Sequence, residues 1–105
     1  MQGAQQNMMA CQDKLKGLRL AMMADRMQKN LDAATGLSAK DKSDYQADIR
    51  SVRDAAEQGL QMPNPVDPAN PMRAMARLSA EEQLAMGTEF SQQYTQQLLA
   101  CVQPH

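Results

Sequence analysis

Aromatic and β-branched residues are scarce in this sequence, and their scarcity argues against folds built from β-strands. The 105 residues include three aromatics (Phe90, Tyr45 and Tyr94), no tryptophan, one isoleucine, three valines and three threonines. Strands favour aromatic and β-branched side chains, whereas the alanine, glutamine, methionine and leucine that dominate here favour helices. We therefore predict an all-α fold, and the length allows one small domain spanning residues 1–105.

Side chains typical of catalytic sites are also rare. The single histidine is the last residue, His105, and no nucleophile-elbow, zinc-protease or glycine-rich phosphate motif occurs. Two pairs of neighbouring carboxylates, Asp44 with Asp48 and Glu81 with Glu82, are expected on exposed helix faces, where nothing would perturb their pKa values. We therefore expect neither an enzyme nor a bound cofactor.

A strong charge of either sign is absent, and so is a long apolar run. The net charge is −1, and the basic residues of the first helix alternate with acids and lack an aromatic platform for bases. Those basic residues are Lys14, Lys16, Arg19, Arg26 and Lys29. No run of about 18 apolar residues exists. We expect no nucleic-acid partner and no membrane insertion.

The longest stretch without proline predicts a first helix over residues 7–34 that carries two apolar stripes. The first stripe holds Met8, Cys11, Leu15, Leu18 and Met22. The second stripe holds Met9, Leu20, Met23, Met27 and Leu31. At about 100° per residue the stripes lie on different faces, so each needs something to pack against.

Two further helices begin with capping signals. Ser38 followed by Asp41 predicts a helix over 38–60, and Ser79 followed by Glu82 predicts a helix over 79–102. The connector, residues 61–72, contains four prolines and favours an extended, polyproline-like path. At ~3.1 Å per residue the ten residues 62–71 span roughly 30 Å, which matches the length of the second helix. We predict a three-helix bundle in which this crossover returns the chain along the bundle.

This crossover determines whether the two cysteines, Cys11 and Cys101, can meet. It would make the third helix antiparallel to the first and bring both thiols to one end of the bundle, whereas an up-down-up path would separate them. We therefore predict one disulfide, with two buried free thiols as the alternative. The first six residues lack the features of a signal peptide. We expect a periplasmic or secreted protein whose signal peptide was removed, with a cytoplasmic location as the alternative.

The second stripe of the first helix is the candidate partner-binding surface: Met9, Leu20, Met23, Met27 and Leu31. Alternatively, the other two helices cover it. We predict a protein that binds another protein, as an adaptor, inhibitor, immunity protein or chaperone, or that binds itself as a homodimer through the first helix. The second hypothesis is a Cu(I) carrier or metal-stress sensor, because thioethers are soft ligands. Its candidate ligands are Met22, Met23, Met27, Met72 and Met75, which could instead simply fill the core.

Residues 78–83, Leu-Ser-Ala-Glu-Glu-Gln, resemble the Leu-Thr-x-x-Gln motif of small periplasmic helical chaperones and metal-stress sensors. Ser79 stands in place of the threonine. The same letters also spell a capped helix, and we carry over no site or activity from the resemblance.

Overall fold

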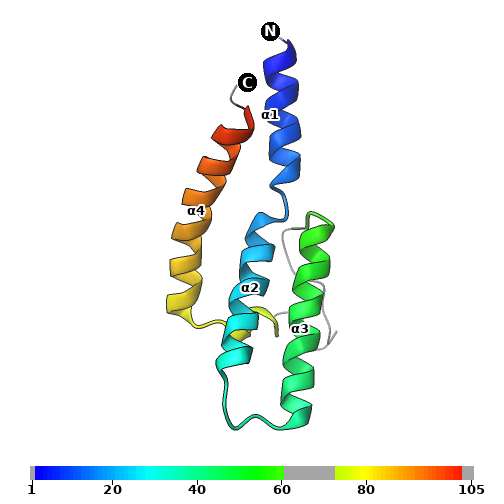
Figure 1. Ribbon diagram of the computed structural model, residues 1–105, viewed down its shortest axis with the longest axis vertical. Coiled ribbons are helices and arrows are strands. Elements are labelled where there is room, and N and C mark those ends of the chain that lie inside the picture. The colour runs from blue at the N-terminus through cyan, green and yellow to red at the C-terminus, as the bar shows by residue number, and fades with distance from the viewer. Residues whose placement is uncertain (1, 61–72, 103–105) are drawn as a thin grey trace.

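A computed structural model describes residues 2–60 and 73–102 of the chain, with side chains from residue 6 onward (Figure 1). The described residues form helices and no strand, which confirms the all-α prediction. Helix α1 spans Gln2–Lys14, α2 spans Leu18–Ala33, α3 spans Ala39–Glu57 and α4 spans Ala80–Val102. A single turn of 3₁₀-helix, η1, spans Met75–Arg77 and precedes α4.

The helices form an elongated body rather than a compact bundle. Helices α2 and α3 lie side by side, α1 continues beyond α2, and α4 runs first beside α2 and then beside α1 (Figure 1). The extents are 56 × 25 × 21 Å, and the radius of gyration of 16.2 Å exceeds the about 13 Å of a compact chain of this length. In this part of the chain, no helix combines the length and apolarity needed to cross a bilayer.

The expected continuous helix over 7–34 is interrupted, so its two halves are the separate helices α1 and α2. Tight backbone bonds close the intervening turn, including one from the Leu18 amide to the Leu15 carbonyl at 3.1 Å. The cause lies in α3: a Cβ atom at Gly17 would overlap the carbonyl oxygen of Ala56. Gly17 thus permits a close approach of two backbones, and the helix breaks where this approach occurs.

The hydrophobic core lies between α2, α3 and the segment that contains η1. Its buried members are Leu20, Met23, Ala24, Met27, Tyr45, Ile49, Val52, Ala55, Ala74 and Leu78. The predicted cap of α3 is confirmed, since the Ser38 hydroxyl accepts a hydrogen bond from the Asp41 amide at 3.1 Å. Helix α4 contributes no buried residue to this core. Only Met86 of α4, which is half-buried, packs against this core among the described residues.

The predicted disulfide is confirmed. Cys11 of α1 is bonded to Cys101 of α4, with their Cα atoms 6.0 Å apart and Cys11 fully buried. The bond requires α4 to run antiparallel to α1 and α2, as we expected (Figure 1). The predicted extended crossover, 61–72, lies outside the described residues.

Candidate functional site

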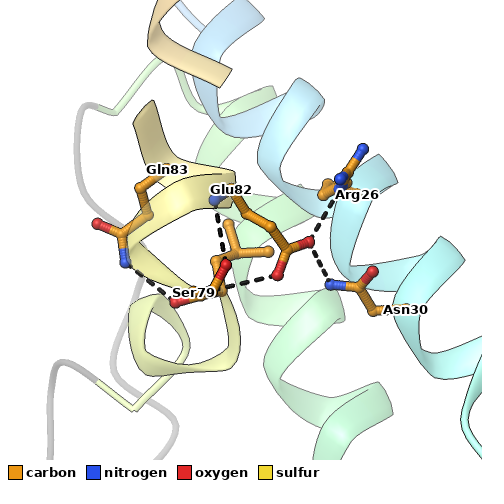
Figure 2. Close-up of polar contacts among 6 residues, drawn as sticks. Arg26, Asn30, Ser79, Glu82 and Gln83 are labelled. Carbon is orange, nitrogen blue, oxygen red and sulfur yellow. Dashed lines mark hydrogen bonds and ion pairs between the residues drawn. The ribbon is translucent and has the colours of Figure 1, made fainter. Parts of the chain in front are cut away.

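The N-terminal end of α4 is fastened to α2 by one carboxylate (Figure 2). Glu82 and Ser79 form the predicted capping box, in which each side chain accepts a hydrogen bond from the other's amide, at 3.2 and 3.1 Å. The second carboxylate oxygen of Glu82 accepts hydrogen bonds from Arg26 Nε and Asn30 Nδ2, both at 2.9 Å.

The sequence predicted that nothing would perturb the pKa of Glu82, and this prediction was wrong, because these donors favour its charged form. The hydrogen bond from Arg26 is the largest cause, followed by those from Asn30 and Ser79, and together they lower the pKa of Glu82 from 4.5 to about 2. Partial burial acts in the opposite direction with a smaller effect. The carboxylate therefore stays ionised at any pH where the protein would normally be studied, and the attachment of α4 to α2 persists.

The C-terminal end of α4 is fastened differently, by the covalent bond from Cys101 to Cys11. Between these two attachments the helix has no buried residue, although it is 23 residues long. An α-helix in a small domain usually buries one stripe of side chains. Helix α4 is thus held at its two ends, and its inward face leaves space against the rest of the molecule.

One part of this space is an apolar cavity of about 120 Å³ between α2, η1 and α4. Its apolar lining consists of Leu20, Met22, Met23, Met75, Leu78, Met86, Gly87 and Phe90. Arg19 and Gln83 supply the polar part of the lining. The Gln83 amide group donates to the Leu78 carbonyl at 3.1 Å, which helps to fix the segment that forms one wall.

A larger and more open hollow of about 770 Å³ adjoins this cavity beside the α1–α2 turn and the end of α3. Its lining consists of Gln12, Asp13, Leu15, Lys16, Arg19, Leu20, Gly59, Leu60, Phe90 and Tyr94. Arg19, Leu20 and Phe90 line both spaces. We call the two together the α4 groove. Its volume falls in the range of known ligand sites.

The charge of the α4 groove is set by Arg19. Lys16 pairs with Asp13 at 3.0 Å, so these two residues nearly cancel. Arg19, in contrast, makes no ion pair with any residue that the structure describes. A positive charge therefore stands at the junction of the two spaces, next to an apolar wall.

The predicted partner-binding stripe is divided between surface and core. Met9 is 64% exposed on α1, whereas Leu20, Met23 and Met27 are buried and Leu31 packs against the core. Helix α3 and the segment around η1 cover the middle of the stripe, which is the alternative that the sequence left open. Leu20 and Met23 still contribute to the wall of the α4 groove.

The candidate copper ligands are brought together only in part. Met22, Met23 and Met75 line the same cavity, whereas Met27 is fully buried in the core and Met72 lies outside the described residues. Met86 also lines the cavity but was not among the predicted ligands. It lies four residues before Phe90, and residues at that spacing share a helix face, so the sequence could have placed Met86 on the inward face with Phe90. Harder metal ligands do not gather in threes anywhere in the described residues.

Asp48 was expected on a solvated face, and this expectation was wrong. Its carboxylate is fully buried and accepts hydrogen bonds from Arg73 Nη2 at 2.7 Å and from Arg77 Nε at 2.9 Å. Arg77 also lies 4.6 Å from the centre of the Tyr45 ring, and burial raises the pKa of Tyr45. Both carboxylate oxygens are thus engaged, and the cluster holds the segment around η1 against α3. It supports the cavity wall without facing the cavity.

Comparison with protein-family models, with curated proteins and with solved structures found no match for this chain. The functional argument therefore depends on the geometry of the α4 groove.

Proposed function

We propose that this is a non-enzymatic exported protein that binds another protein, and that the α4 groove receives an amphipathic helix of that partner. The proposal is supported by a 23-residue helix that is fastened at both ends and whose inward stripe is half-buried, with no fully buried residue, beside a methionine-lined cavity. Methionine side chains adapt their shape to what they contact, and amphipathic helices commonly dock in such grooves.

The size of the cavity indicates what the partner inserts. About 120 Å³ is the space of one large apolar side chain, and such an anchor in a pocket typically supplies much of a binding energy. The adjoining hollow, of about 770 Å³, offers room for residues next to the anchor. We therefore expect the partner helix to present one leucine, methionine or phenylalanine to the cavity.

Arg19 indicates the charge of the partner. It stands where the cavity and the hollow meet and has no ion-pair partner among the described residues. A glutamate or aspartate one helical turn from the apolar anchor would meet this guanidinium in a partly dehydrated setting, where charge pairing is stronger than in water. The preferred partner is thus an acidic amphipathic helix.

An exported location fits the covalent link between α1 and α4. Structural disulfides form and persist mainly in oxidising compartments such as the periplasm or the extracellular space. The proposal therefore places the encounter with the partner helix outside the cytoplasm.

The binding proposal can be tested with fluorescently labelled amphipathic peptides of about 18 residues, or roughly five helical turns. One peptide carries a leucine anchor flanked by glutamate, and a second carries the same anchor flanked by lysine. Fluorescence anisotropy should show tighter binding of the acidic peptide. Arg19→Glu should reverse this preference, because the charge at the junction changes sign.

Gly87→Leu tests the cavity itself. A Cβ at Gly87 would meet nothing within 4 Å, so the added side chain can enter the cavity without disturbing the fold. We expect at least about a tenfold loss of peptide affinity. Leu84→Ala is the matched control, since Leu84 lies on the same helix, is 77% exposed and lines neither space. Equal affinity of the wild type and Gly87→Leu would refute the proposed binding site.

One observation favours the second candidate function, a Cu(I) carrier. Met22, Met23, Met75 and Met86 line one cavity, and several thioethers around one space are a set that suits Cu(I). The positive charge of Arg19 at the same cavity opposes a cation there. Titration of the protein with Cu(I) against a competing chelator tests this candidate. The copper proposal predicts that the wild type retains Cu(I) in the presence of the chelator and that Met75→Leu and Met86→Leu each weaken this binding.

A further inference from the structure

The charged residues of this chain are confined to one part of the molecule. All 11 basic and 12 acidic residues lie between residues 13 and 89, and residues 1–12 and 90–105 contain none. An even distribution would place about six of the 23 in these two end segments. The structure brings the segments together, because the disulfide joins α1 to the second half of α4 (Figure 1). We call this two-helix, charge-free part of the molecule the arm, comprising residues 2–12 of α1 and residues 90–102 of α4.

No third helix among residues 2–60 and 73–102 lies beside the arm. In the other half of the molecule α2 contacts both α3 and α4, but α3 ends near the level of the α1–α2 turn and does not extend beside α1 (Figure 1). Two helices alone cannot enclose a core. Among the described side chains of the arm, Cys11 is the only fully buried one, while Met9 and Leu99 are 64% and 55% exposed.

The arm has no charged residues and exposes a methionine and a leucine. This composition is typical of the centre of a protein interface and differs from that of an ordinary surface. Charged residues are depleted where proteins meet, and methionine is enriched there. A typical solvent-facing helix surface carries interspersed charges of both signs, as the described surface of α3 does with Lys40, Asp41, Arg53 and Asp54. The arm therefore differs from the rest of the same molecule in the way an interface does.

We propose that the arm binds the arm of a second copy of this chain, through the α1 side that α3 leaves uncovered. A pairing with two-fold symmetry brings each residue near the axis close to its own counterpart, so any charged residue there would face its like. A charge-free patch removes this repulsion, so the arm is electrostatically compatible with a second copy of itself. Four helices, two from each copy, then form the bundle that two cannot form alone.

The arm and the α4 groove border each other, because Phe90 lines both spaces and Gln12 and Tyr94 line the hollow. Met9 lines neither space, so a substitution there tests self-association without altering the lining of the groove. Peptide affinity and dimerisation are separate measurements, and either proposal can fail without the other.

Sedimentation velocity of the oxidised full chain over a wide concentration range tests the proposal. We expect a species with twice the 11.6 kDa chain mass at high concentration. Met9→Glu should raise the dimer dissociation constant at least about tenfold, because it places a charge in the interface. Met9 is largely exposed, so the substitution leaves the monomer folded, which circular dichroism can verify.

Leu84→Glu is the matched control. Leu84 is the more exposed residue and lies on α4, but it belongs to the charged half of the molecule. The arm is supported as the interface if Met9→Glu weakens dimerisation and Leu84→Glu leaves it unchanged. A monomer at every concentration, a dimer that Met9→Glu does not affect, or equal effects of both substitutions would overturn it.

Discussion

Opening the disulfide between Cys11 and Cys101 should release the arm while the core between α2 and α3 stays folded. The core holds ten buried residues, whereas Cys11 is the only fully buried residue among the described side chains of the arm. Packing alone therefore holds the arm weakly, and the covalent bond supplies most of its attachment. The prediction is a regional loss of structure rather than general unfolding.

The magnitude follows from the length of chain that the bond closes. The two cysteines are 90 residues apart. In the chain-entropy model, a closed loop of this length removes unfolded-state entropy equivalent to about 4.6 kcal/mol at 25 °C. We expect the double substitution of both cysteines by serine to lower the free energy of complete unfolding by about 3–5 kcal/mol.

Urea denaturation measures this change, and hydrogen exchange followed by mass spectrometry locates it. Both are performed on oxidised wild type and on the double serine variant, at concentrations where each is a monomer. Amides of α1 and of residues 90–102 should lose protection in the variant, while those of α2 and α3 should keep theirs. A loss below about 1 kcal/mol, or equal loss of protection in all helices, would refute the reasoning.

Three other predictions concern the fold around the groove. Gly17→Ala should destabilise the protein by more than about 2 kcal/mol, because the added methyl group would overlap the Ala56 backbone. Gly87→Ala should stabilise it by up to about 1 kcal/mol, because the added methyl group meets nothing within 4 Å and alanine favours a helix. Thermal melts should show a lower melting temperature for the first variant and a higher one for the second. Asp48→Ala should lower the free energy of unfolding by about 3 kcal/mol, because it leaves the guanidinium groups of Arg73 and Arg77 without their carboxylate. Urea denaturation measures this loss, and an unchanged midpoint would contradict it. Glu82 has a folded-state pKa lowered from 4.5 to about 2, so its charge stabilises the fold above pH 4.5 and this contribution disappears as the pH falls towards 2. The difference in melting temperature between wild type and Glu82→Gln should therefore narrow in that window, and a difference independent of pH would contradict the assignment.

Local signals in the sequence were sufficient where the structure depends on neighbouring residues. Ser38 and Ser79 cap their helices as predicted, because each needs only a backbone amide three residues away. The disulfide was predicted from the expected path of an extended connector; the bond is confirmed, whereas the connector, 61–72, lies outside the described residues. These features involve short-range bonding or simple chain geometry, and neither depends on details of side-chain packing.

Features that depend on distant residues could not be predicted. The break at Gly17 arises from the approach of Ala56, and helix periodicity across that position gives no sign of it. The burial of Asp48 depends on Arg73 and Arg77, which are 25 and 29 residues further along the chain. Its register, three residues after Tyr45 and four before Val52, does place Asp48 on the buried face of α3, but its burial as a charged group also needs these two arginines. The cavity likewise required the relative position of α2 and α4, which periodicity alone does not supply.

The same dependence explains why a cavity persists beside α4. A helix free to settle would gain packing contacts by closing the space that Met86 and Phe90 line. The bond at Cys101 and the hydrogen bonds of Glu82 fix the two ends of α4. Closing the space would therefore require at least one of these attachments to shift. A partner side chain that enters the space gains such contacts without having to separate the helices first.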